Sequence, residues 1–207
     1  MLKFSYTKQI DSFTSIANPN WGGCGMELSI DKARYRNLFQ TYSWGQIVSK
    51  FEVLNSLPPQ SLISNVNIVP FLGEKCVLVR LDNGKWEMPG GTLEPDEDYL
   101  TAIQRELLEE AGAKLVSSFA AFGAWKLISS AEKPYKPHLP HPISYRVVGY
   151  GDVELVSAPC IPEDGERVEA VEAMTLREAQ HHFSRCGRAD LAELYEIADV
   201  LRRHRVS

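Results

Sequence analysis

Residues 91–113 read GTLEPDEDYLTAIQRELLEEAGA, and this stretch carries most of the information about the fold. Its spacing predicts one helix, whose first turn accepts Pro95 and whose dipole favours the acids around it. Gly112 predicts the end of that helix, because glycine readily takes the left-handed conformation of a helix stop. Four apolar residues at helical spacing predict the face that packs on a core: Leu100, Ile103, Leu107 and Ala111.

Three carboxylates share another face of the predicted helix. Glu106, Glu109 and Glu110 stand at relative positions i, i+3 and i+4, so at about 100° per residue they lie within an arc of about 100°. Like charges held this close repel one another unless a cation lies among them. Carboxylate oxygens suit hard divalent ions, so the pattern predicts a metal site of that kind.

The spacing of the whole segment resembles the Nudix box. Seven fixed positions of that pattern have their residue here: Gly91, Glu97, Arg105, Glu106, Glu109, Glu110 and Gly112. If each match is roughly a 1-in-15 event, the coincidence is on the order of 10⁻⁸ per starting position. Only Ala113 departs, at a place that prefers Ile, Leu or Val and that packs rather than reacts. The resemblance extends in pattern over residues 65–180 and does not reach the first sixty.

The resemblance implies an α/β fold, a Nudix-type α/β/α sandwich with a mixed central sheet, here with an N-terminal, partly helical extension. It implies a hydrolase that cleaves a diphosphate linkage in a nucleoside diphosphate derivative, with water attacking phosphorus. Mg²⁺ or Mn²⁺, held by the three glutamates and the Gly90 carbonyl, would bridge phosphate oxygens and lower the pKa of a bound water. In the family the arginine of the box orients a glutamate, a role that corresponds to Arg105, with Glu97 as its partner about two helical turns earlier.

Two regions of the chain provide candidates for the general base. Some members of the family use a box glutamate, which corresponds to Glu106 here. Others use an acid on a later loop, where Glu163, Asp164 and Glu166 are available. The alternative interpretation of these loop acids is that they are only solvated.

Alternating and apolar runs predict the remaining elements. Strands are expected at 65–72 and 75–81, then one bent strand or two at 114–130, and a strand or a hairpin at 143–156. Residues 166–179 resemble the closing strand of the family and the start of its second helix. A last helix is expected at about 189–203.

A proline-rich loop separates two of these strand regions. Residues 132–142 hold four of the twelve prolines of the chain, with Tyr135 and Lys136 as candidates to bind substrate phosphates or a base. A stiff surface connection is the alternative interpretation. His138 and His141 lack an evident third ligand for a transition metal.

Length and composition bound the class of protein. The chain has 207 residues, 44% of them hydrophobic, and no run of about 20 apolar residues or signal peptide, so we expect a cytoplasmic protein without a membrane partner. The four dispersed cysteines suggest free thiols. The 22 basic and 27 acidic residues give a net charge of −5, so a binding surface for DNA or RNA is not expected. A small phosphorylated nucleotide as substrate is compatible with this charge.

The first sixty residues are rich in aromatic side chains and should be folded. Residues 31–57 suggest a largely helical segment, and the Pro58-Pro59 pair marks a boundary between an extension over 1–60 and a hydrolase domain over 61–207. Whether the extension covers the site or forms a homodimer interface is left open.

Three alternatives compete with a nucleotide hydrolase. The first is a catalytically silent Nudix-like module that binds a nucleotide or a protein, against which the complete set of glutamates argues. The others are an isopentenyl diphosphate isomerase, which carries an altered box, and an RNA-cap hydrolase, against which the acidic balance argues. Residues 113–133 lack the Pro or Tyr that marks the ADP-ribose and diadenosine polyphosphate types, and the NADH and coenzyme A signatures are missing. Nucleoside triphosphates, oxidised ones included, and nucleotide sugars remain as substrates.

Overall fold

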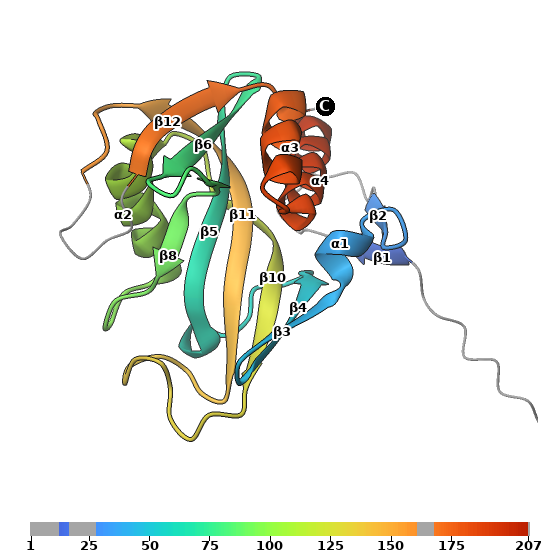
Figure 1. Ribbon diagram of the computed structural model, residues 1–207, viewed down its shortest axis with the longest axis vertical. Helices are drawn as coiled ribbons and strands as arrows, with labels where there is room; N and C mark the ends of the chain where they lie inside the picture. Colours follow the sequence, from blue (N-terminus) through green and yellow to red (C-terminus); the bar gives the residue numbers. More distant parts are fainter. Residues whose placement is uncertain (1–12, 17–27, 161–167, 207) are drawn as a thin grey trace, which may run out of the picture.

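A mixed β-sheet forms the centre of the molecule in the computed structural model, which describes residues 13–16, 28–160 and 168–206 (Figure 1). Its main strands are β3 (Thr41–Trp44), β4 (Ile47–Val53), β5 (Ile63–Leu72), β6 (Lys75–Leu81), β10 (Ala120–Ser129), β11 (Ile143–Leu155) and β12 (Val168–Met174). They lie in the order β12, β6, β5, β11, β10, β4, β3. The β5 and β11 pair is parallel and the other neighbours are antiparallel, so the sheet is mixed as expected.

Helices cover both faces of this sheet. Helix α2 (Tyr99–Ala111) packs through Ile103 and Leu107 on one face, against strand residues that include Val66 and Val147. Helices α3 (Leu176–Arg185) and α4 (Ala189–Val206) pack on the other face, over residues that include Val148. The two cores, one on each side of the sheet, confirm the predicted α/β/α sandwich.

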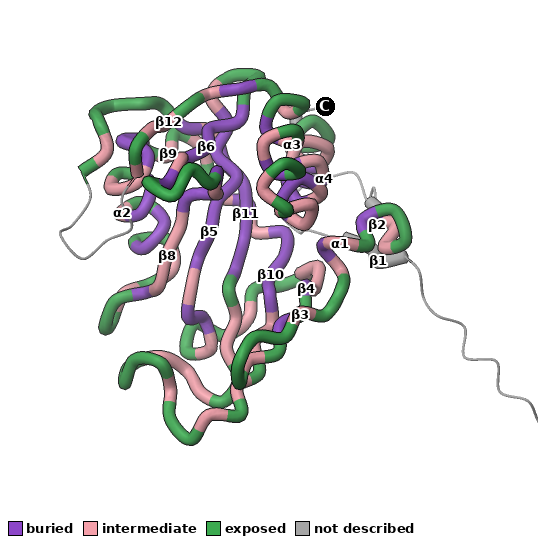
Figure 2. The backbone as a smooth tube through the Cα atoms, in the orientation of Figure 1, coloured by how far each residue is buried: buried purple, intermediate pink, exposed green. Residues whose placement is uncertain are grey.

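The face under α3 and α4 is covered over only part of its length. Val148 and Tyr150 of β11 are buried beneath these helices, whereas Arg146, two residues earlier on the same face, is exposed. Figure 2 shows the same change along β11, from a buried upper part to an exposed lower part. The uncovered part of this face provides the floor of a cavity.

Short elements complete the structure. They are β1 (Phe13–Ile16), β2 (Leu28–Asp31), η1 (Gln60–Leu62), β7 (Trp86–Glu87), β8 (Gly90–Thr92) and β9 (Ala113–Leu115). Strands β1 and β2 pair with each other in a separate two-stranded sheet. The strands expected at 65–72 and 75–81 are present, 114–130 contains two strands, and 143–156 forms one long strand rather than a hairpin.

The prediction of a largely helical segment over 31–57 is wrong. Helix α1 covers only Arg36–Phe39, and β3 and β4 form a hairpin that pairs with β10. The hairpin turns at Gly45, which has a φ of 54°. Both strands are rich in β-branched and aromatic residues, which favour strands when a turn residue lies between them.

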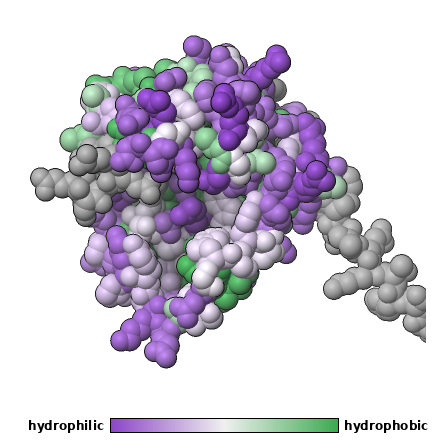
Figure 3. All heavy atoms as spheres, viewed as in Figure 1, coloured by the Kyte–Doolittle hydropathy of each residue, from purple (hydrophilic) through white to green (hydrophobic). Residues whose placement is uncertain are grey.

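The described part of the chain contains no helix that is long and apolar enough to cross a membrane. The face of the molecule seen in Figure 3 is mainly hydrophilic, with smaller hydrophobic areas among the polar ones.

Candidate active site

Helix α2 carries the acidic cluster and has a defined cap at each end. The Asp98 side chain accepts hydrogen bonds from the backbone amides of Leu100 (2.9 Å) and Thr101 (3.1 Å), so the helix begins after Asp98. The sequence suggested that Pro95 lies in the first turn of the helix. In the structure Pro95 precedes the helix. Gly112 ends the helix in the left-handed conformation with a φ of 57°, as predicted.

The buried face of α2 differs from the prediction at its first turn. Ile103, Leu107 and Ala111 are buried as expected, together with Ala102. Leu100 is 40% exposed, because it lies on the same side of the helix as the exposed Leu108, whereas Tyr99 packs against the core. The helix is therefore anchored along its length, including the turns that carry the three glutamates of the cluster.

Arg105 joins the carboxylates of the box. Its Nε and Nη2 atoms donate to the two carboxylate oxygens of Glu97 at 2.9 and 3.0 Å. Its Nη1 atom donates to Glu106 Oε1 at 2.9 Å and to Glu109 Oε2 at 3.2 Å. The expected pairing of Arg105 with Glu97 is thus present, although Glu97 lies before the helix and not two turns along it.

Gly90 and Gly91 bring the backbone of β8 against the same carboxylates. The Gly90 amide donates to Glu110 Oε2 at 2.9 Å. Gly90 has a φ of 140°, and a Cβ atom there would lie 2.3 Å from the Val66 carbonyl oxygen. A Cβ atom on Gly91 would lie 2.1 Å from Glu106 Oε1. Both positions therefore require glycine, the first for backbone conformation and space, the second for space alone.

The pKa values within this cluster move in different directions. Burial raises the pKa of Glu106, and the attraction of Arg105 offsets this only in part. Burial also acts to raise the pKa of Glu97, but the hydrogen bonds from Arg105 and from the Glu94 amide outweigh it, so this pKa lies below its ordinary value. The glutamate ion pairs raise the pKa of Arg105, which stays charged.

The residues of the cluster suit a hard divalent cation by their chemistry. Three carboxylates, those of Glu97, Glu106 and Glu109, pair with one guanidinium, and Glu110 adds a fourth on the Gly90 amide, so negative charge is in excess here. All prospective donors are oxygen atoms, as such ions prefer. No group of three or more His, Cys, Asp or Glu side chains within the described residues converges closely enough to hold a metal. In this arrangement Arg105 and the Gly90 amide donate hydrogen bonds to the carboxylate oxygens that would otherwise face a cation.

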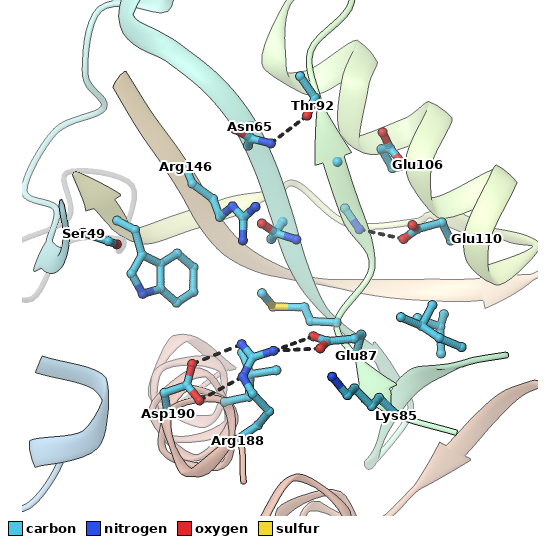
Figure 4. A pocket seen from close by; sticks show the side chains of 18 of the residues that line it. Ser49, Asn65, Lys85, Glu87, Thr92, Glu106, Glu110, Arg146, Arg188 and Asp190 are labelled. Atoms are coloured by element: carbon cyan, nitrogen blue, oxygen red, sulfur yellow. Dashed lines mark hydrogen bonds and ion pairs between the residues drawn. The ribbon is translucent and has the colours of Figure 1, made fainter. Parts of the chain in front are cut away.

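A cavity of about 920 Å³ extends from these carboxylates over the open part of the sheet. Its acidic end is lined by Gly90, Gly91, Arg105, Glu106, Glu109 and Glu110, and its floor by Asn65, Asn67, Trp125, Leu127 and Arg146. Figure 4 shows Glu106 and Glu110 across the cavity from Arg146 and Ser49. The predicted metal-binding residues therefore share one end of a cavity that is much longer than the cluster itself.

The proline-rich loop lies at the border of this cavity. Tyr135 and Lys136 both line it, and Tyr135 is 87% exposed. His138 Nε2 makes a hydrogen bond of 2.9 Å with the Leu93 carbonyl oxygen, which ties the loop to the segment between β8 and α2. The alternative base candidates Glu163, Asp164 and Glu166 lie outside the described residues.

Several cavity residues were not singled out from the sequence. Asn65 and Asn67 lie on the cavity face of β5, and their alternation with apolar residues in an otherwise apolar strand is a signal that could have identified them. Trp125 and Arg146 lie on the neighbouring strands and carry no comparable signal.

A satisfied ion-pair network closes another side of the cavity. Arg188 Nη1 donates to both Glu87 carboxylate oxygens at 2.7 and 2.9 Å, and the rest of its guanidinium pairs with Asp190. This network joins β7 to the start of α4 (Figure 4).

Comparison with protein families gives a match that covers most of the chain. The sequence pattern of the NUDIX domain matches residues 62–195. The chain is 46% identical over 43 residues to a MutT-like protein of Streptomyces ambofaciens and 48% identical over 40 residues to an RNA pyrophosphohydrolase of Afipia carboxidovorans. These segments are 21% and 19% of this chain, and they span only about a quarter of the two relatives, 28% and 24%.

Solved structures show more distant likenesses. A Bacillus subtilis pyrophosphohydrolase is 20% identical, with 65% of this chain and 77% of that chain covered and a TM-score of 0.48. A NUDIX hydrolase of Nitrosomonas europaea is 18% identical, with 66% and 90% covered and a TM-score of 0.46.

Proposed function

This chain belongs to the NUDIX family, and from that premise we propose that it is a pyrophosphohydrolase. Its substrate is a nucleoside diphosphate derivative, either a nucleoside triphosphate, oxidised ones included, or a nucleotide sugar, and water attacks phosphorus. One observation carries the proposal: Arg105 gathers Glu97, Glu106 and Glu109 beside the Gly90 and Glu110 pair at one end of a cavity. A diphosphate is strongly negative, so this acidic end suits it only through a cation.

Divalent metals are typical of the family, and Mg²⁺ or Mn²⁺ is the ion proposed here. Glu106, Glu109, Glu110 and the Gly90 carbonyl would hold it. When bound, such an ion neutralises phosphate oxygens and makes water more acidic. The hydrogen bond between the Gly90 amide and Glu110 supports this set, because it holds a backbone segment and a carboxylate side by side.

The residues of the chain divide the remaining work. Arg105 keeps Glu106 and Glu109 in place and is itself held by Glu97, which makes Arg105 and Glu97 positioning residues. Glu106 is the proposed acceptor of the proton from water, at Oε2, since Oε1 accepts from Arg105. The raised pKa of Glu106 favours this role, because a stronger base accepts a proton more readily. Glu163 and Glu166 are kept as the alternative bases.

Tyr135 and Lys136 are the proposed contacts to the substrate outside the box. Both line the cavity, and Lys136 provides a positive charge that can approach phosphate oxygens. The loop that carries them is tied down through His138. A stiff connection and a substrate contact are therefore compatible roles for one loop.

A product-resolved assay tests the proposal. The full chain would be incubated with Mg²⁺ or Mn²⁺ and a panel of nucleoside triphosphates, oxidised nucleotides, nucleotide sugars and RNA with a 5′-triphosphate. We expect metal-dependent release of phosphate or diphosphate from at least one small nucleotide. Glu110→Gln should lower that rate by about 100-fold or more, because losing even an outer partner of a metal ligand costs about 10- to 100-fold.

Glu172→Gln is the matched control, since Glu172 is an exposed residue of β12 that does not line the cavity. It should keep the wild-type rate. Hydrolysis by Glu110→Gln at the wild-type rate would contradict the mechanism. No product from any substrate, together with thermal stabilisation by a nucleotide, would instead identify a silent binding module.

A further inference from the structure

The cavity continues beyond the region that the family pattern covers. Tyr42, Trp44 and Ser49, all on the β3–β4 hairpin, line its far wall. The NUDIX match starts at residue 62, so this wall lies outside the matched residues. A wall of the cavity limits which substrates fit, and its chemistry therefore bears on specificity.

Strand pairing places the floor residues in one continuous row. Trp125 of β10 pairs with Phe51 of β4 on one side and with Arg146 of β11 on the other. Arg146 in turn pairs with Asn65, which pairs with Thr92 of β8. Trp125 is thus three strands from β8, about 14 Å at the usual strand spacing. The row leads from the acidic cluster to the hairpin.

Aromatic groups gather at the hairpin end of this row. Trp125 is 9% exposed and packs against Phe51, with ring centroids 5.2 Å apart and planes at 67°. Phe51 packs in the same edge-on manner against Phe39. Trp125 is therefore rigidly supported from behind, and Trp44 adds a second, half-exposed indole to the cavity wall.

Asn67 presents a buried acceptor without a partner. Its side chain is in the cavity lining and the residue is 7% exposed. The Nδ2 atom donates to the Pro89 carbonyl oxygen at 3.4 Å, which fixes the orientation of the amide. The Oδ1 atom has no hydrogen-bond partner. A buried acceptor left unpaired is unfavourable, so its place in a cavity points to a ligand that donates an N–H or O–H group.

We infer that this end of the cavity binds the nucleobase of the substrate and that the β3–β4 hairpin is a specificity element. A flat ring can stack on tryptophan or on a guanidinium, which Trp125, Trp44 and Arg146 provide. Asn67 pairs with Gly90 of β8 and so lies toward the acidic end, where its Oδ1 can accept a hydrogen bond from a ribose hydroxyl. This inference rests on the proposed function only in placing the diphosphate at the acidic end.

The hairpin is held in position by contacts outside the cavity. Glu193 of α4 accepts a hydrogen bond from the Leu38 amide at 2.7 Å and from the Asn37 side chain. The Tyr42 hydroxyl donates to the Asn37 carbonyl oxygen at 3.0 Å. These contacts connect the hairpin, through α1, to the C-terminal helix and give the wall a fixed place relative to the floor.

Binding without catalysis tests the inference. The full chain in EDTA would be titrated by calorimetry with AMP, GMP, CMP and UMP, and with ribose 5-phosphate as the probe that lacks a base. We expect at least one nucleoside monophosphate to bind about tenfold or more tightly than ribose 5-phosphate, as stacking on aromatic side chains provides. Trp44→Ala should remove about five- to tenfold of that preference, whereas Asn67→Ala should weaken the binding of every probe that carries a ribose, ribose 5-phosphate included.

Val48→Ala is the matched control on the same hairpin. Val48 is 43% exposed and precedes Ser49, so it lies on the opposite face of β4 from the cavity. It should bind every probe as the wild-type chain does. Equal affinity for ribose 5-phosphate and all four nucleotides, or no binding at all, would overturn the inference, as would unchanged nucleotide binding by both Trp44→Ala and Asn67→Ala. A thermal melt of each variant separates lost folding from lost contacts.

The outcome is independent of the proposed hydrolysis. A chain that binds nucleotides through Trp44 and Asn67 but releases no product supports the base site and contradicts the hydrolase. A chain that hydrolyses substrates but shows no preference for a base supports the hydrolase and contradicts the base site.

Discussion

At the scale of single residues, the space left by a missing Cβ atom decides where Glu106, the proposed base, lies. Glu106 extends into the room above Gly91, and its carboxylate would collide with any larger residue there. The same carboxylate accepts from Arg105 and has a raised pKa because it is buried. The glycine of the box is thus required by the space that a side chain fifteen positions later occupies.

Gly91→Ala should therefore lower kcat by about 100-fold, because a displacement of about 1 Å at a reacting group costs about that much. Its stability should change little, since the backbone of Gly91 is not in the left-handed region. Steady-state kinetics and a thermal melt would measure the two effects.

Gly73→Ala is the control, since Gly73 has a φ of 59° and open space around it in the turn between β5 and β6. It should show the opposite behaviour, with stability lower by about 1–2 kcal/mol and full activity. If Gly91→Ala kept the wild-type kcat, the position of Glu106 would not matter for turnover and the prediction would be wrong.

At the scale of elements, α2 presents its acids because both its ends are defined. Asp98 caps the first turn and Gly112 stops the last one. Thr101 adds a side-chain hydrogen bond to Asp98 at 2.6 Å, which lowers the pKa of Asp98. The ion pair between Arg105 and Glu97 then joins the helix to the loop before it. Two hydrogen bonds fix the acidic face relative to β8, from Arg105 to the Thr92 carbonyl oxygen and from the Gly90 amide to Glu110.

Asp98→Ala should lower the free energy of unfolding by about 1 kcal/mol, the usual cost of losing an N-cap. Asp98→Asn keeps an acceptor oxygen and should lose much less. Urea denaturation followed by circular dichroism would measure both midpoints. The same midpoint for Asp98→Ala and the wild-type chain would show that water replaces the cap without loss.

At the scale of the whole molecule, the segment before residue 60 and the C-terminal helix are joined. Glu193 binds the amide of Leu38, and Arg34 pairs with Glu196, so α1 is held on α4. Strands β3 and β4 extend the central sheet from the same segment. The division of the chain at residue 60 and a homodimer both stay predictions.

Glu193→Ala should increase amide hydrogen exchange across residues 36–53 by about tenfold or more, because hydrogen bonds to a charged acceptor are lost there. Mass spectrometry of peptide fragments would locate the change. Asp199→Ala is the control on the same helix, since Asp199 pairs with Arg203 and not with the N-terminal segment. An equal increase over the whole chain would mean that Glu193 stabilises α4 itself.

Local patterns were enough to predict much of the candidate site. Strands 65–72 and 75–81 follow from apolar and β-branched runs, and the end of α2 follows from Gly112. The clustering of Glu106, Glu109 and Glu110 follows from helical geometry. The failures came where tertiary contacts decide. The hairpin at 41–53 forms because β10 offers it a partner, and Leu100 is exposed because the core lies on the side of α2 that carries Tyr99 and Ile103.

The sequence by itself determined the box helix, its acidic face and the family, because these depend on spacing within about twenty residues. Only the tertiary structure decided what lies opposite that face. Asn67, Trp125, Arg146 and Trp44 come from four strands, and the pairing of those strands brings them into one cavity. Strand pairing between distant segments depends on the packing of the whole sheet, so no local pattern contains it.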